Sequence, residues 1–91
     1  MKPIKFSSDF RKKLKVIRKR DNKLFKKIQK QLKLFQINPR HKSLRLHKVT
    51  RDVKSVWSIS IDMNVRMLYI DSDEAFYFFA LGSHDEVYKR Q

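Results

Sequence analysis

The chain has 91 residues, which is enough for one small domain with a single modest core. It contains 23 Lys and Arg against 9 Asp and Glu, a formal net charge of +14, and no cysteine. Disulfides and thiolate chemistry are therefore excluded, and the composition fits a reducing compartment. The N-terminus carries no long apolar run, so we expect no signal peptide, no membrane partner and a location in the cytoplasm.

The positive charge is concentrated in one part of the chain. Residues 1–54 have a net charge of +17, whereas residues 55–91 have a net charge of −3. A field of this strength attracts polyanions and raises the rate of association with them. It favours nucleic acid, bound through its phosphates, or an acidic protein as the partner. The alternative is a lysine-rich helical surface that only faces water.

Two helices are predicted after a short edge strand at residues 3–6. Ser7 and Asp9 supply N-cap side chains for the first helix, and we expect it to end near Asp21. The second should end at Asn38-Pro39, because proline lacks the N–H group that a helix interior needs. Each helix has apolar residues at spacings of three and four, which is typical of one buried face. These residues are Phe10, Leu14 and Ile17 in the first helix, and Leu24, Ile28, Leu32 and Phe35 in the second.

Three strands are predicted in the last third of the chain, at residues 56–61, 65–70 and 75–82. In the first, Trp57, Ile59 and Ile61 occur at every second position, which predicts one buried face. The third is apolar on both faces, as is typical inside a sheet. A basic connector at residues 40–54 has a strand-like centre at residues 44–49, and residues 82–88 form a tail.

This order of elements predicts an α+β fold in a single domain spanning residues 1–91. An N-terminal strand and an antiparallel helix hairpin would pack on a mainly antiparallel sheet, with both helices on one face. A free coiled coil is the alternative for the two helices, but their stripes are short and the strands need a cover.

The sequence offers little material for metal or cofactor chemistry. His41, His47 and His84 are not at ligand spacing, the acids are scattered, and the single glycine rules out a phosphate loop. We therefore expect no metal and no cofactor. RNA supplies its own nucleophile, the 2′-hydroxyl, so an enzyme acting on it needs a base, an acid and a cation for the phosphate. The residue types for such a reaction are present as His47, Arg66, His84 and Tyr88.

Three segments carry a resemblance to a known family: LRLHKV at residues 44–49, VRMLYI at residues 65–70, and LGSHDEVY at residues 81–88. They resemble the RelE/ParE toxin superfamily, and most closely its YafQ-type branch, whose toxins cut messenger RNA on the ribosome. The resemblance implies a RelE-like fold, the ribosome and messenger RNA as partners, and an acidic antitoxin. It also implies that His47, Arg66, His84 and Tyr88 are the catalytic residues.

The chain departs from the pattern of its relatives at two positions of interest. YafQ-type toxins carry a further histidine and an aspartate where this chain has Ser60 and Asn64, and RelE has lysines near Ser58 and Ser60. We expect Ser60, Asn64 and Asp85 to support the catalytic side chains, with a solvent-exposed carboxylate as the alternative for Asp85. The ParE branch, which poisons gyrase, generally lacks the histidine set, so His47 with His84 argues against it. A non-catalytic basic module that binds nucleic acid is the other alternative.

Each candidate has a role and a plainer alternative. Arg66 should clamp a phosphate, although an ion pair with Asp62 or Asp71 is the alternative. The basic residues around His47 should lower its pKa and keep it neutral, as a base requires. His84 has its ordinary alternative in capping a turn, and Tyr88 either stacks on a base or anchors the tail. The predicted RNA-binding residues are Arg45, Lys48, Arg51 and Lys54 in the connector, and Lys12, Lys13, Lys19, Lys26 and Lys27 in the helices.

Overall fold

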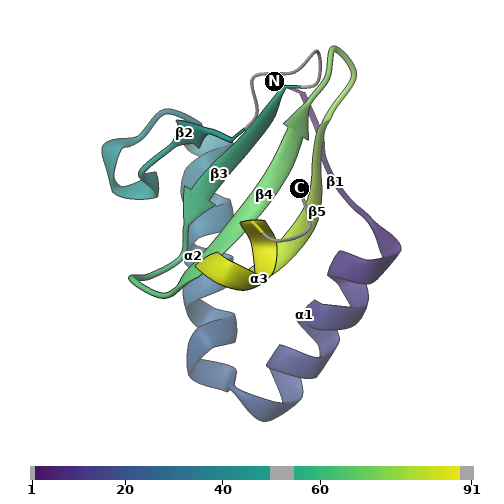
Figure 1. Cartoon of the computed structure of the whole chain (residues 1–91), viewed down its shortest axis with the longest axis vertical. Coiled ribbons are helices and arrows are strands. Elements are labelled where there is room, and N and C mark those ends of the chain that lie inside the picture. The colour runs from purple at the N-terminus through teal and green to yellow at the C-terminus, as the bar shows by residue number, and fades with distance from the viewer. Residues whose placement is uncertain (1, 50–54, 89–91) are drawn as a thin grey trace.

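A computed structural model of the chain describes residues 2–49 and 55–88, the last of these by its backbone. The elements follow one another in the predicted order, with a short 3-10 turn and one helix at the end in addition (Figure 1). Their bounds are β1 (Ile4–Phe6), α1 (Ser8–Arg20), α2 (Asn22–Ile37), the 3-10 turn η1 (Lys42–Leu44), β2 (His47–Lys48), β3 (Val56–Ser60), β4 (Val65–Asp71), β5 (Phe76–Ser83) and α3 (His84–Tyr88).

The five strands form one sheet in the order β1-β5-β4-β3-β2. β1 pairs with β5 in parallel, and the other three pairs are antiparallel, so the predicted mainly antiparallel sheet and the edge position of the first strand are both confirmed. β4, which carries Arg66, is the central strand of the five. The expected α+β class is therefore confirmed.

The helix boundaries follow from the capping residues that the sequence provides. The Ser7 hydroxyl accepts a hydrogen bond from the backbone N–H of Phe10 at 3.1 Å and begins α1. Asp21 ends α1 and begins α2, and its carboxylate accepts the N–H of Leu24 at 3.0 Å. Such side-chain acceptors satisfy N–H groups that a first helical turn leaves open. Asn38 caps the end of α2, as its position before a proline predicts.

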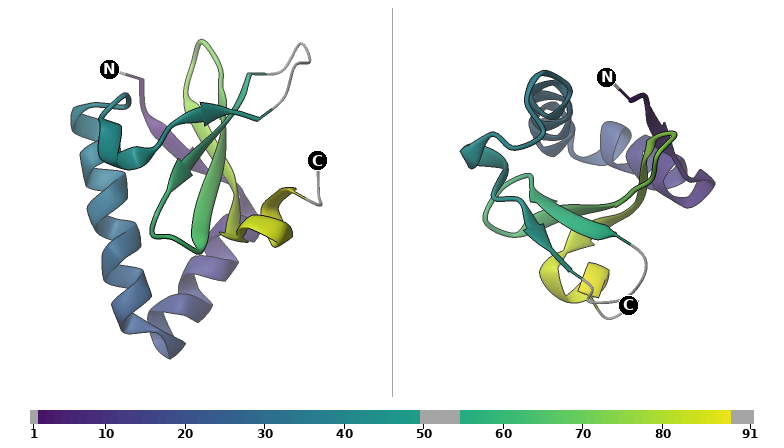
Figure 2. Two further views of the ribbon diagram at one scale, coloured as in Figure 1. Left: turned by 60° about the vertical axis from the view of Figure 1, so that its left-hand side comes forward. Right: turned by 90° about the horizontal axis from the view of Figure 1, so that it is seen from above.

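The predicted helix hairpin packs on one face of the sheet, while α3 lies on the other face (Figure 2). The two long helices meet at the Asp21 turn and splay apart toward the sheet. Phe35 of α2 is the centre of the core, because its ring centroid lies 4.9 Å from that of Tyr69, 4.9 Å from that of Phe76 and 5.3 Å from that of Phe78. Truncating a buried phenylalanine of this kind to alanine costs roughly 3–5 kcal/mol. This cluster therefore holds β4 and β5 against α2.

Two expectations about the strands need correction. Only His47–Lys48 of the predicted segment 44–49 forms a strand, because η1 occupies its beginning and Arg45 adopts a left-handed conformation with φ 48° and ψ 51°. β3 is buried on both faces instead of one, with Ser58 at 0% and Ser60 at 7% exposure. β5 is an inner strand between β1 and β4, as its apolar sequence predicts, although Tyr77 on it is 37% exposed.

The tail at residues 82–88, for which no helix or strand was predicted, has regular structure. Residues 84–88 form the short helix α3, which packs against β4 and β5. Its Val87 is only 2% exposed, and Leu68 of β4 is fully buried. Leu68 alternates with Met67 and Tyr69, which face α1 and α2, so it belongs to the opposite face of the sheet, where α3 lies.

Candidate functional site

Arg66 is the residue on which the candidate site is built. It lies in β4 opposite Ser60 of β3, but its side chain reaches across to the next residue on the same face. Its Nε donates to the Ser58 hydroxyl oxygen at 2.6 Å, and its Nη2 donates to the backbone carbonyl of Arg45 at 3.2 Å. Two fixed acceptors therefore direct the guanidinium toward β2.

The acids that were the alternative partners of Arg66 are engaged elsewhere. Asp62 pairs with Lys27 at 3.5 Å, and Asp71 pairs with Lys2. Arg66 is bonded to neutral oxygens, so its positive charge remains to act on another group. This arrangement is what a phosphate-binding arginine requires.

His47 lies beside the guanidinium. It faces Ser58 across the β2–β3 pair, and its Nδ1 lies 3.3 Å from Nη2 of Arg66. Partial burial lowers the pKa of His47 from 6.5, and the positive charges of Arg66 and His84 lower it further, while a hydrogen bond with the backbone of Arg45 raises it. The imidazole is therefore held in its neutral, basic form near neutral pH. The direction of this shift confirms the expectation, but its causes are burial and Arg66 instead of the basic neighbours in sequence.

His84 joins the same cluster from a third element. It is the first residue of α3, its side chain is 69% exposed, and its charge acts on the pKa of His47. The side chain of Asp85 is 88% exposed, and its Oδ1 lies 3.8 Å from Nδ1 of His84. That separation is within reach of an ion pair but exceeds a hydrogen bond.

The start of α3 is held by a reciprocal pair of hydrogen bonds that the sequence analysis missed. The backbone N–H of Ser83 donates to Oε1 of Glu86 at 3.0 Å, and the N–H of Glu86 donates to the Ser83 hydroxyl at 3.2 Å. This is a capping box, and its pattern of serine followed three residues later by glutamate was readable in the sequence. The box fixes the position of His84, which lies between its two members.

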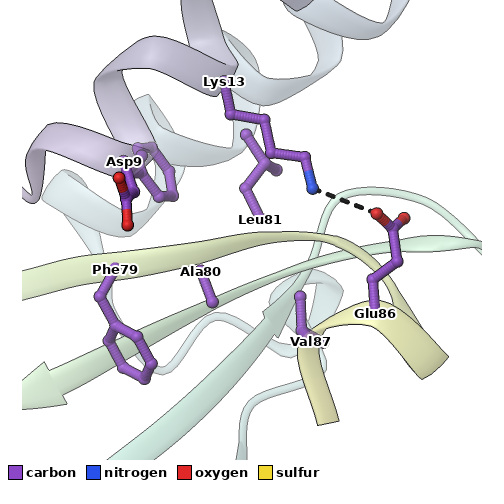
Figure 3. Close-up of a pocket in the computed structure, with 8 residues that line it drawn as sticks. Asp9, Lys13, Phe79, Ala80, Leu81, Glu86 and Val87 are labelled. Atoms are coloured by element: carbon purple, nitrogen blue, oxygen red, sulfur yellow. Dashed lines mark hydrogen bonds and ion pairs between the residues drawn. The ribbon is translucent and has the colours of Figure 1, made fainter. Parts of the chain in front are cut away.

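Glu86 also connects α3 to the helix hairpin. Its Oε2 lies 3.3 Å from Nζ of Lys13, and this pair closes a small cavity between α1, β5 and α3 (Figure 3). The pair passes close to Gly82, where an added Cβ would lie 2.9 Å from Nζ of Lys13 and 3.1 Å from Oε1 of Glu86. Gly82 has no positive φ, so its small size, and not its conformational freedom, suits this position.

The structure leaves some predicted residues outside the cluster. Arg51 and Lys54 lie outside the described residues, as does the side chain of Tyr88, whose backbone ends α3. The Ser60 hydroxyl donates to the backbone carbonyl of Asp62 at 2.8 Å. Asn64 is exposed in the β3–β4 turn, with its backbone N–H bonded to the Asp62 carboxylate.

The residues around the cluster can supply a base, an acid and a cation. Arg66 provides a fixed positive charge, His47 a neutral imidazole, and His84 an exposed imidazole.

Within residues 2–49 and 55–88, no three His, Cys, Asp or Glu side chains gather as a metal site would require. None of the helices in these residues is long and apolar enough to cross a membrane.

No family model and no curated protein matches the sequence, whereas solved structures do resemble it. A crystal structure of YafQ from E. coli strain BL21(DE3) gives a TM-score of 0.77 at 20% identity, over 97% of this chain and 99% of that one. The chain has the RelE-like fold. The YoeB dimer from Staphylococcus aureus gives a TM-score of 0.70 at 23% identity, over 91% of this chain and 97% of that one. For the E. coli DinJ-YafQ complex the values are 0.72 and 22%, over 92% and 94% of the two chains.

Within this RelE-like fold, two further residues hold the site together. Ser58 is fully buried and bonds Arg66. Gln31 of α2 is 8% exposed, and its Nε2 donates to the backbone carbonyl of Ser60 at 2.8 Å and to that of Ser43 at 3.4 Å. Gln31 thereby links the end of β3 to the turn that precedes β2. No local pattern in the sequence signals either contact, because both depend on strand register and helix docking.

The predicted RNA-binding residues of this chain differ in their surroundings. Lys12, Lys19 and Lys26 are exposed on α1 and α2, and Arg45 and Lys48 are exposed next to the cluster. Lys13 and Lys27 are engaged with Glu86 and Asp62. The last two therefore contribute to the attachment of α3 and of the β3–β4 turn.

Proposed function

We propose that this protein is the toxin of a type II toxin–antitoxin system. Its activity would be that of an endoribonuclease, which cuts translated messenger RNA on the ribosome without a metal ion. The observation that carries the proposal is the contact between Arg66 and His47, a fixed cation 3.3 Å from an imidazole of lowered pKa. A cation next to a neutral base serves a reaction in which a proton leaves while negative charge builds on a phosphate.

The proposed reaction uses the 2′-hydroxyl of the RNA as the nucleophile. His47 takes the proton of that hydroxyl, and its oxygen attacks the adjacent phosphorus. Arg66 stabilises the negative charge that forms on the phosphoryl oxygens. The bond to the 5′-oxygen of the next nucleotide breaks, and His84 gives this oxygen a proton. The products are a 2′,3′-cyclic phosphate and a 5′-hydroxyl end, and Tyr88 would stack on a neighbouring base.

The charge distribution supports the ribosome as the place of action. Residues 1–54 carry a net charge of +17. Lys12, Lys19 and Lys26 are exposed on the helix hairpin, whereas Arg66 belongs to the strand face opposite Met67, which packs in the core beneath the hairpin. The hairpin is thus available for ribosomal phosphates while the other face meets the message. Arg45, Lys48, Arg51 and Lys54 would bind the message itself.

An acidic antitoxin is the proposed protein partner. The E. coli DinJ-YafQ pair and the S. aureus YoeB-YefM pair are toxin–antitoxin complexes with the same fold on the toxin side. The basic surface of this chain calls for a partner of opposite charge, since complementary charge speeds association and fixes the register of a complex. Its gene would lie next to the gene of this protein.

Primer extension on a translated message tests the proposal. The protein is induced in growing cells, and the ends of one message are mapped with and without its start codon. Cuts within the reading frame that disappear without the start codon support a ribosome-dependent nuclease. DNA damage with an intact message would instead indicate a gyrase-directed protein, and neither effect would indicate a non-catalytic binding module.

A further inference from the structure

The β3–β4 turn and the segment before β2 enclose a polar hollow beside Arg66. It has a volume of about 210 Å³ and is lined by Arg45, Ser60, Asp62, Met63 and Arg66, among others. Apart from Met63 and Ile61, the lining side chains are polar or charged. Because Arg66 lines the hollow, whatever occupies it lies next to the group held by that guanidinium.

Met63 forms the outer rim of this hollow, with 97% of its surface exposed. The turn that presents it is tightly bonded. The Asp62 carboxylate accepts the backbone N–H groups of Asn64 at 2.8 Å and Val65 at 2.9 Å, and Lys27 of α2 pairs with its other oxygen. The backbone of the turn is therefore fixed on the C-terminal side of Met63, which keeps this residue at the edge of the hollow.

We propose that this hollow receives one base of single-stranded RNA, the base adjacent to the phosphate held by Arg66, with Met63 packed on its face. A base has an apolar face and a polar edge, and it matches a polar hollow with one apolar rim. Thioethers pack favourably on aromatic rings, and arginine planes stack on unstacked bases. An apolar protein segment fits worse, because it would take water from Arg45 and Arg66 without replacing their hydrogen bonds. The inference rests on the proposed RNA-cleaving function.

The test compares three variants with the unaltered protein. Met63→Ala removes the contact, Met63→Leu retains an apolar side chain of similar size, and Ile37→Ala is the matched control. Ile37 is also strongly exposed, at 76%, but it lies at the end of α2 on the other side of the sheet. Cleavage by ribosomes programmed with messages of varied sequence gives the base preference at each position around the cut.

Packing of a thioether on an aromatic ring is worth about 0.3–1.5 kcal/mol. Met63→Ala should therefore lower kcat/KM by roughly 2- to 10-fold and flatten the base preference at one position beside the cut. Met63→Leu should keep both closer to the unaltered protein than Met63→Ala does, and Ile37→Ala should match the unaltered protein. Unchanged kcat/KM and preference in Met63→Ala would overturn the inference. So would weaker binding of the acidic partner with unchanged cleavage, which would mark a protein-docking surface.

A binding measurement separates this inference from the proposed function. A short single-stranded oligoribonucleotide carrying 2-aminopurine is titrated with each protein, and the fluorescence of the probe reports the environment of that base. If the unaltered protein changes the fluorescence and Met63→Ala does not, the base site stands even where no RNA is cut. If the two proteins behave alike, the base site is wrong, whatever the result for cleavage.

Discussion

Arg66 and Ser58 are joined by a short hydrogen bond, with 2.6 Å between Nε and the hydroxyl oxygen. Ser58 is fully buried, so this contact is shielded from water. The Ser58 hydroxyl in β3 accepts the hydrogen bond from Arg66 in β4. On the other side of β3, His47 of β2 is the residue paired with Ser58. A serine in the middle of an apolar strand thus sets the direction of the cation that would meet the phosphate.

Ser58→Ala should reduce catalysis more than substrate binding. A hydrogen bond to a charged group is worth about 1.5–3 kcal/mol, so kcat should fall roughly 10- to 100-fold with a small change in KM. The control is Ser72→Ala, because Ser72 loses hydrogen bonds to Ala75 in the β4–β5 turn, away from the cluster. Equal losses of activity in the two variants would show that Ser58 acts only through stability.

The pKa of His47 should depend on Arg66. Burial and the charge of Arg66 both lower the pKa of His47 from 6.5, so the imidazole stays neutral somewhat below that pH. Replacing Arg66 by glutamine removes one of the causes that lower the pKa of His47, and this pKa should rise part of the way back. The imidazole signal of His47 in a pH titration by NMR gives this value directly.

The same shift has a consequence for stability. Because the folded state disfavours protonated His47, the unfolded chain binds its proton more readily. This contribution therefore destabilises the fold as the pH falls from above 6.5 toward the lower pKa of the folded state. The contact between Arg66 and His47 would be contradicted if the pKa of His47 were the same in the Arg66→Gln variant as in the unaltered protein.

Gln31 should support both the stability and the activity of the protein. Gln31→Leu removes the donor to the carbonyl of Ser60, and a buried acceptor left without a partner costs about 1–3 kcal/mol. The free energy of unfolding, measured by urea denaturation, should fall by about that amount. Gln36→Leu on the same helix is the control, because Gln36 is exposed. If Gln31→Leu behaved like Gln36→Leu, the bridge between the two segments would be unimportant.

The sequence predicts the elements far better than the contacts between them. Helix ends could be predicted because capping residues act locally, as Ser7 and Asp21 do. The burial of Ser58 and Gln31 could not, because it results from packing between segments distant in the sequence. The left-handed Arg45 also gave no signal, since nonglycine residues seldom adopt that conformation.

The cluster itself was accessible from the sequence only through family resemblance. His47, Arg66 and His84 are separated by roughly twenty residues each, and no spacing rule brings them together. Strand order does so, because β2, β3 and β4 are neighbours and α3 follows β5. The helical tail is the one feature that was missed although its signal was present, in the serine and glutamate of the capping box.

The capping box predicts a graded response at Glu86. Glu86→Gln keeps an acceptor for the N–H of Ser83 but loses the charge that pairs with Lys13, whereas Glu86→Ala loses both. Because the box positions His84, cleavage should fall several-fold more in Glu86→Ala than in Glu86→Gln. Single-turnover cleavage rates at saturating ribosome check this order. Equal rates in the two variants would show that the orientation of α3 does not matter to the reaction.

The chemistry of the RNA ends tests the central claim most directly. Purified protein is added to ribosomes programmed with a defined message, and the fragments are analysed for their termini. The proposed reaction predicts 5′-hydroxyl and 2′,3′-cyclic phosphate ends, and no cut where the nucleotide before the scissile phosphate carries 2′-deoxyribose. It also predicts that His84→Ala lowers the cleavage rate by roughly 10²-fold or more. Fragments with 5′-phosphate ends, or cleavage at the deoxyribose position, would contradict attack by the 2′-hydroxyl and the roles of His47, Arg66 and His84.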